Sequence, residues 1–229
     1  PVFFFFFEDT LTPISIFLKM GGDRAENSFL LESVINNEKL GRNSFLGVNA
    51  RAVLRGQKGK FTLSHPGKSE KDISFEGDPL AFLEKQFKGI KAVADPSLPA
   101  FYGGAVGFLS YDAIRYYENI PDKNPDPIGQ EDIYLVFADD LVMVDHVERN
   151  VRLVANVRLD EYPDIDTAYD GALARLDAMI QRLRQPIEET RPTSVSGKME
   201  ITSNMTEHEY RAIVARAKEY IFAGDIFQV

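Results

Sequence analysis

The chain of 229 residues contains no cysteine and no tryptophan. Without cysteine there is no disulfide framework, no thiolate zinc site and no cysteine nucleophile. Because this usage fits a reducing compartment, we expect a cytoplasmic protein. Basic residues are fewer than acidic ones, 26 against 35, and the formal net charge of −9 argues against nucleic acid or an anionic membrane as the main partner. No apolar run approaches the ~18 residues that a membrane-spanning helix needs.

Recognisable catalytic motifs are missing as well. The sequence has three histidines, each without a second ligand at the spacing typical of a metal site: His65, His146 and His208. No serine sits in a nucleophile elbow. The glycines of "GGAVG" (103–107) lack the Lys-Ser/Thr pair of a phosphate-binding loop. We interpret them as permitting a bulge or close backbone packing.

After its opening residue Asp132, the segment "DIYLVFADDLVMVDH" carries three further acids, Asp139, Asp140 and Asp145. Such acids can indicate a metal site, but acids within a strand are explained more simply by its solvent-facing side. We therefore expect these three carboxylates to lie in water. On these grounds the sequence predicts no catalytic residue and no metal ligand.

Five consecutive phenylalanines occupy positions 3–7. The run is too short for the apolar core of a signal peptide, and it lacks the basic start and the small-residue cleavage site. An exposed run of this kind would favour aggregation. Two interpretations stay open, a buried segment or poorly determined residue identities, and no prediction from the sequence uses the run.

Helices and short strands alternate irregularly in the predicted element order. Four segments carry helix caps or helical periodicity: 12–21, 78–89, 165–185 and 206–224. Strand patterns occur between them, ending in a predicted hairpin of 141–147 and 151–159. In the third helix we expect one buried face, formed by Tyr169, Leu173, Leu176, Ile180 and Leu183. The predicted fold class is α+β, with mainly antiparallel strands in two packed sheets and flanking helices.

The composition changes twice near the end of the sequence. Residues 186–204, "PIEETRPTSVSGKMEITSN", have the composition of a linker. We therefore predict a first region at 1–185, a linker at 186–204 and the beginning of a second domain at 205–229. The last of these opens with a capping box and ends with the apparent start of a strand, "DIFQV", so we expect a truncated domain there.

Six phrases, in collinear order, resemble component I of anthranilate synthase, the chorismate-using enzyme of tryptophan biosynthesis. They cover nearly the whole chain and are "LTPISIFLK", "FLLESV", "GRNSFLG", "GGAVGFLSYDAIRYYE", "DIYLVFADDLVMVDH" and "AKEYIFAGDIFQV". The resemblance implies that 1–185 is an N-terminal regulatory region and that 205–229 opens the chorismate-binding domain. In the family, the residues for chorismate and Mg²⁺ lie in that later domain, so this fragment is expected to be inactive alone.

The resemblance also implies a parent enzyme with known partners. That enzyme converts chorismate and ammonia to anthranilate, with Mg²⁺ at the chorismate site. A glutamine amidotransferase subunit supplies the ammonia, which makes the parent a hetero-oligomer, and L-tryptophan inhibits it by feedback. We expect no nucleic acid and no membrane among the partners.

The "LLES" strand lies at the family's feedback site for tryptophan. The resemblance carries over one residue from the "TP" motif, three from "LLES" and two from the start of "GRNSF": Pro13, Leu31, Glu32, Ser33, Arg42 and Asn43. A buried ammonium needs acceptors and a buried carboxylate needs donors. We expect Glu32 to meet the ammonium and Ser33 to meet other polar atoms, with apolar walls from Pro13 and Leu31.

Spacing alone supports a different interpretation of Glu32. A carboxylate at the end of a strand can turn to water or pair with Lys39 or Arg42, and without the resemblance this interpretation is preferred. Two further departures concern the ligand site: the family often has an aromatic residue in place of Asn43, and part of the family's site comes from the chorismate-binding domain.

Two other functions compete with the regulatory one. Aminodeoxychorismate synthase component I, the sister enzyme of the folate branch, shares the architecture, although the intact "TP" helix and full "LLES" favour the tryptophan branch. A stand-alone ligand-binding or docking module is the third possibility, and it requires no exposed apolar surface around residues 210–229.

Overall fold

The computed structural model describes residues 1–32, 41–67, 71–93, 95–188 and 201–228. The chain divides into two compact units, Pro1–Glu188 and Glu189–Val229. The predicted linker lies largely outside the described residues. None of the described helices is both long enough and apolar enough to span a membrane.

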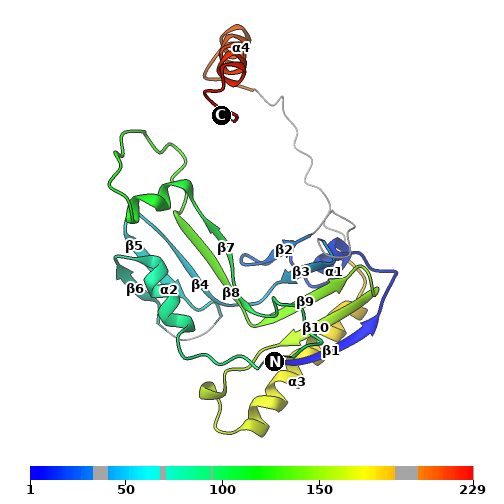
Figure 1. Ribbon diagram of the computed structural model, residues 1–229. Helices are drawn as coiled ribbons and strands as arrows, with labels where there is room; N and C mark the ends of the chain where they lie inside the picture. Colours follow the sequence, from blue (N-terminus) through cyan, green and yellow to red (C-terminus); the bar gives the residue numbers. More distant parts are fainter. Residues whose placement is uncertain (33–40, 68–70, 94, 189–200, 229) are drawn as a thin grey trace. The chain divides into compact units, whose positions relative to one another are not determined.

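The first unit contains two five-stranded antiparallel sheets in its described residues (Figure 1). Sheet A has the order β1-β10-β9-β3-β2, with strands Val2–Phe7, Asn150–Ala155, Asp140–Asp145, Asn43–Gly47 and Phe29–Leu31. Sheet B has the order β6-β5-β4-β8-β7, with strands Ile73–Glu76, Lys60–Ser64, Ala50–Gln57, Ile133–Ala138 and Gly104–Leu109. The predicted α+β class with two antiparallel sheets is confirmed.

The two sheets are joined where the chain passes directly from one into the other. Residues 48 and 49 connect β3 to β4, and Asp139 alone connects β8 to β9. Both connections therefore lie at the junction of the sheets, and neither leaves room for a helix. This is why the order along the chain shows no regular βαβ alternation.

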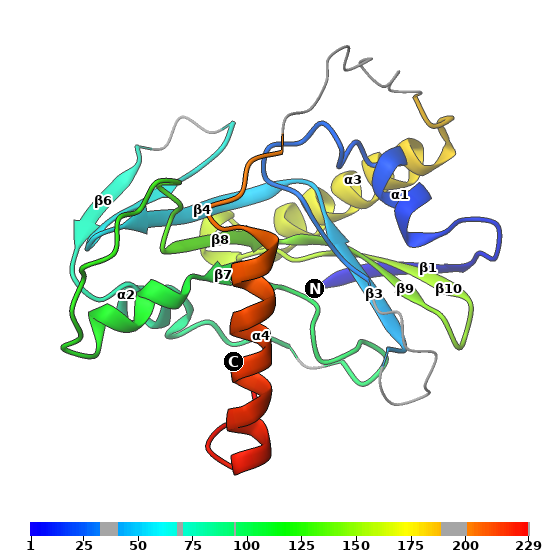
Figure 2. The same cartoon turned by 90° about the horizontal axis from the view of Figure 1, so that it is seen from above.

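Helices cover one face of sheet A (Figure 2). Helix α1 (Pro13–Lys19) contacts β2 and β3, whereas α3 (Ile165–Arg184) contacts β1 and β10. Ile16 of α1 and Leu176 of α3 are buried in one core with Leu46 and Val142 of the sheet. The opposite face carries a separate cluster, in which Leu98 is buried against the strands.

The buried face of α3 differs from the predicted one. The buried positions are Ala168, Ala172, Leu176, Met179 and Leu183. Tyr169 is 50% exposed and Leu173 is 37% exposed, so the prediction was wrong at both. Alanines allow the helix backbone to approach the sheet closely, and the larger side chains are therefore turned to the rim.

Sheet B packs its own core against α2 (Pro79–Phe87). Phe82 of α2 stacks on Phe75 of β6, with ring centroids 3.9 Å apart. Asp78 caps α2 by accepting from the backbone N–H groups of Leu80 and Ala81. The 3₁₀ helix Tyr111–Tyr116 lies beyond β7, and a second one, Leu159–Glu161, replaces the end of the predicted strand 151–159 after Ala155.

The second unit contains α4 (Glu207–Ala223) in its described residues. Thr206 and Glu209 form the predicted capping box, and Gly224 ends the helix with a left-handed φ of 83°. No residue of α4 is buried. The apolar side chains Tyr210, Ile213 and Phe222 are exposed.

Candidate functional site

Three of the predicted tryptophan-binding residues, Leu31, Glu32 and Asn43, lie at the end of β2 and the start of β3 in sheet A. Leu31 is the last residue of β2 and is paired with Phe45 of β3. Its side chain is 47% exposed, and Glu32, which follows it, is exposed. Asn43 begins β3. Ser33 and Lys39 lie outside the described residues.

Pro13 is the first residue of α1. The helix starts with a capping box: the Thr12 hydroxyl accepts from the Ser15 N–H, and the Ser15 hydroxyl accepts from the Thr12 N–H. Proline occupies the first turn. Pro13 is buried, and α1 contacts β2 and β3. The helix packs on the face of the sheet that contains Leu30 and Leu46.

Leu31 and Asn43 belong to the other face. Leu31 is opposite Phe45, Asn43 is two residues before Phe45 on the same strand, and alternate residues of a strand share a face. The predicted tryptophan-binding residues therefore lie on two different faces of sheet A. Pro13 belongs to the helix-covered face, whereas Leu31 and Asn43 belong to the face that the helices leave open.

Arg42 is held by acids of the β9–β10 turn. Its guanidinium lies 2.7 Å from the buried Asp145 and 2.6 Å from the half-exposed Glu148. Burial would raise the pKa of Asp145, but hydrogen bonds from Arg42 and from the backbone N–H groups of Glu148 and Val147 outweigh it and lower this pKa. Arg42 thus fixes the start of β3 to β9 across 103 residues of sequence.

A polar row crosses the sheet beside this ion pair. Asn43, Asp145 and Asn150 are cross-strand neighbours on β3, β9 and β10. The Oδ1 atoms of Asn43 and Asn150 are buried and have no hydrogen-bond partner among the described residues. A buried acceptor without a partner costs about 1–3 kcal/mol. Each of these oxygens therefore keeps an unused acceptor position.

Sequence analysis missed two polar residues near this edge. Ser44 is fully buried, and a hydrogen bond of 2.8 Å joins its Oγ to Nε2 of His146. Ser44 and Leu46 alternate with Asn43 and therefore belong to the helix-covered face. The sequence did contain a signal for this bond: Ser44 places a hydroxyl inside the apolar run "NSFLG". A buried hydroxyl requires a hydrogen-bond partner.

A second cluster of polar side chains, which are partly buried, lies at the junction of the sheets. The carboxylate of Asp139 is 3.1 Å from Nε of Arg51, and that of Asp140 is 2.7 Å from Nη1 of Arg175. Burial raises the pKa of Asp139 against the opposing charge of Arg51. Burial also raises the pKa of Asp140, to about 6, although Arg175 opposes this.

The expectation that all three acids face water is wrong. Asp145 is 1% exposed, and the side chains of Asp139 and Asp140 are 26% and 13% exposed. Arginines that are distant in sequence neutralise these carboxylates. The carboxylates can therefore be withdrawn from water, although the sequence pattern of the strand predicts that they are exposed. No group of three or more His, Asp or Glu within the described ranges is arranged to hold a metal ion.

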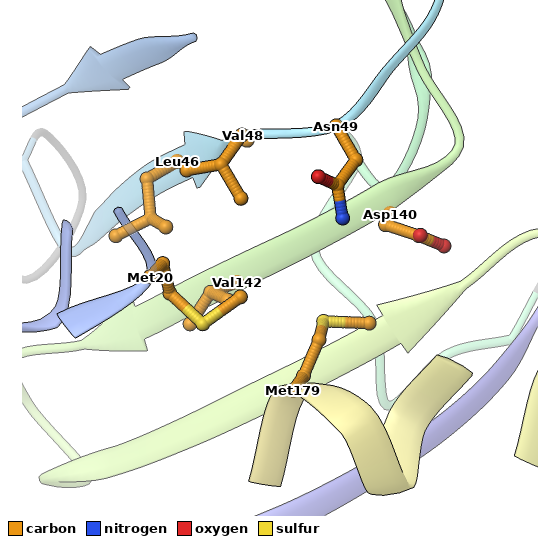
Figure 3. A pocket seen from close by; sticks show the side chains of 8 residues that line it. Met20, Leu46, Val48, Asn49, Asp140, Val142 and Met179 are labelled. Carbon is orange, nitrogen blue, oxygen red and sulfur yellow. The ribbon is translucent and has the colours of Figure 1, made fainter. Parts of the chain in front are cut away.

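A small cavity lies next to Asp140 (Figure 3). Its volume is about 10 Å³, which is the lower limit for one water molecule. Met20 and Met179 line it together with Asn49 and Asp140. The cavity is too small for an amino acid.

Comparisons with known proteins point to one family. A sequence model described as chorismate binding enzyme matches residues 27–229. Anthranilate synthase component 1 from Pseudomonas putida is 40% identical over 225 residues, which are 95% of this chain and 44% of that protein. The protein of the same name from Pseudomonas aeruginosa is 37% identical over 235 residues, covering 100% of this chain and 46% of the relative.

A solved structure shows the same fold. Anthranilate synthase component I from Streptococcus pneumoniae superposes with a TM-score of 0.58 and 24% sequence identity. The match covers 96% of this chain and 45% of that chain. The chain therefore spans less than half the length of the relatives and of the solved structure that it matches.

Proposed function

Because the chain belongs to the chorismate-binding enzyme family, we propose that it is the regulatory part of an anthranilate synthase component I. The family resemblance to proteins named anthranilate synthase component 1 supports this assignment. The proposed parent enzyme converts chorismate and ammonia to anthranilate in the cytoplasm. A glutamine amidotransferase subunit supplies the ammonia, and L-tryptophan inhibits the reaction.

The ligand site of the proposal is the β2 edge of sheet A, and one observation carries it. Asn43 Oδ1 is buried without a partner among the described residues, on the same sheet face as the half-exposed Leu31. The ammonium of tryptophan would donate to Asn43 Oδ1 and to the Glu32 carboxylate. This meets the requirement that a buried cation finds acceptors.

The other proposed residues complete the set. Leu31 would offer apolar surface to the indole, and Ser33 would supply a hydroxyl to the polar end of the ligand. Pro13 is buried on the opposite face of the sheet, so we assign it the role of supporting β2 through α1 rather than touching the indole. Arg42 is already paired with Asp145 and Glu148. We therefore assign it the role of fixing Asn43 in place, because it anchors the start of β3.

Inhibition would follow from differential binding. If tryptophan binds one arrangement of the enzyme better than another, the coupling is typically ~1–3 kcal/mol. The chemistry itself would take place outside the 229 residues. We expect no anthranilate from this chain with chorismate, ammonia and Mg²⁺, because the family resemblance assigns the residues for chorismate and Mg²⁺ to the later part of the chorismate-binding domain.

Tryptophan binding can be measured directly, because the chain has no tryptophan of its own. We would excite added L-tryptophan at the red edge of indole absorption and follow its anisotropy while the protein is titrated. Saturable binding is expected for the chain, with a loss of at least tenfold in affinity for Glu32→Ala. An exposed glutamate of sheet B provides the matched control, Glu76→Ala, which should bind like the original chain.

Two outcomes would contradict the proposal. Absence of saturable binding would exclude a tryptophan site on this chain. Equal affinity of the Glu32→Ala variant and the original chain would place the site elsewhere. The choice of pathway needs a product analysis with the full-length enzyme, because anthranilate and aminodeoxychorismate carry the amino group at different ring positions.

A further inference from the structure

The β1 edge of sheet A, opposite the proposed tryptophan site, carries a groove of about 390 Å³. This volume falls in the range of ~300–1,000 Å³ that is typical of small-molecule sites. Three phenylalanines and four polar residues line it: Phe3, Phe5, Phe7, Ser97, Glu148, Asn150 and Arg152. We propose that this groove binds a neutral aromatic molecule that carries one hydrogen-bond donor.

The apolar side of the groove comes from alternate residues of β1. Phe3, Phe5 and Phe7 share one face of the strand, because successive side chains point to opposite faces. Phe5 is 54% exposed and Phe7 is 79% exposed. Aromatic rings left in water at a concave surface favour an aromatic ligand, which can stack on them or meet them edge to face.

The polar side comes from β10, which pairs with β1. Asn150 is paired with Phe7, and Arg152 with Phe5. Asn150 is 3% exposed, and its Nδ2 donates to Glu148 over 3.0 Å. Its Oδ1 has no partner in the described part of the chain. The missing partner is a donor, so the ligand of this proposal carries an N–H or O–H group.

The charges beside the groove indicate that the ligand is neutral. Arg152 lies 3.0 Å from Glu148 and 3.8 Å from Asp145. Arg42 pairs with the same two acids. Two cations and two anions thus neutralise each other, and a charged ligand would have to displace one of them. A neutral donor satisfies Asn150 Oδ1 without breaking an ion pair.

Two matched probes test this proposal on the whole chain. 4-Fluorophenol carries the ring and the donor, and 4-fluoroanisole carries the same ring without the donor. Binding is followed by ¹⁹F NMR of the probe and by amide shifts of β1 and β10. We expect 4-fluorophenol to bind roughly tenfold more tightly, which is the effect of one hydrogen bond.

Variants separate the two sides of the groove. Asn150→Leu should bind both probes equally, because the acceptor is lost. Phe7→Ala removes an exposed ring and should weaken both probes at least threefold, which keeps the proposal testable if Asn150→Leu does not fold. Asn124→Leu changes an exposed asparagine away from the sheets and should have no effect.

The proposal would be overturned by several results. These are the absence of amide shifts in β1 and β10, a phenol preference that survives in Asn150→Leu, or unchanged binding in Phe7→Ala. Since none of these residues belongs to the proposed tryptophan site, failure here leaves the tryptophan titration unaffected. Loss of tryptophan binding would likewise leave the groove intact.

Discussion

Strand β9 begins with Asp140, which is largely buried, and ends with Asp145, which is fully buried, and the two carboxylates have opposite pKa shifts. Burial raises the pKa of Asp140 to about 6. At the other end, burial acts on Asp145 in the same direction, but hydrogen bonds outweigh it and the pKa is lowered. Each carboxylate lies 2.7 Å from an arginine, Arg175 or Arg42, so an arginine partner alone does not explain the difference.

The other groups around the two carboxylates explain why their pKa shifts are opposite. Asp145 also accepts from the backbone N–H groups of Val147 and Glu148, over 3.0 and 2.9 Å. Asp140 has the negative charge of Asp139 beside it instead. A buried carboxylate stays ionised when several donors converge on it, and it takes up a proton when a like charge replaces them.

The largest expected effect is the loss of Asp145. Asp145→Ala removes the acceptor for two backbone N–H groups and one partner of Arg42, and should lower the free energy of unfolding by about 3 kcal/mol. Urea unfolding at pH 7 measures this. Asp140→Ala should cost clearly less, since its ionised form is penalised by burial. Equal costs would refute the contrast between the two ends.

The pH dependence of stability gives the next effect. The folded pKa of Asp140 is about 6, above the ordinary value near 3.9 of an unfolded chain. Between pH 6 and pH 4 the folded state therefore holds a proton that the unfolded state has released, and stability rises as the pH falls.

Asp140→Asn should abolish this contribution. The free energy of unfolding of the original chain, minus that of the variant, should increase by about 2 kcal/mol from pH 7 to pH 4.5. Asp145→Asn is the control, because a lowered folded pKa gives stability that is lost only as the pH falls below about 4. A flat difference for Asp140→Asn would mean that Asp140 is ionised throughout this range.

Glu148 should give the smallest effect. Its side chain is 50% exposed although it contacts both Arg42 and Arg152, so water screens these pairs. Glu148→Gln should change the free energy of unfolding by less than about 1 kcal/mol, and less still in 1 M salt. A cost as large as that of Asp145→Ala would show that the exposed acid, rather than the buried one, holds Arg42.

Local structure was predictable where a few neighbouring residues decide it. Thr12, Asp78 and Thr206 cap their helices as predicted, because a side-chain acceptor and the N–H groups that it satisfies are within three residues. The antiparallel α+β class followed from short strands without regular crossover helices. Burial was predicted less well, as Ala168 and Ala172 show by taking the place of Tyr169 and Leu173 against the sheet.

The candidate site was predictable in part. The resemblance selected the end of β2 and the start of β3, and the structure places Leu31, Glu32 and Asn43 at that edge. Sequence reasoning could not show that Arg42 is engaged by Asp145, nor that Ser44 is bonded to His146. These partners are 103 and 102 residues away in sequence.

The amino-acid sequence by itself determined the helix caps, the strand-rich class, the family resemblance and the absence of thiol chemistry, because these depend on residue type and on short-range pattern. Only the tertiary structure decided which acids are buried, which keep their charge and which acceptors lack a donor. Those properties depend on arginines and backbone N–H groups that strand pairing brings together from distant parts of the chain.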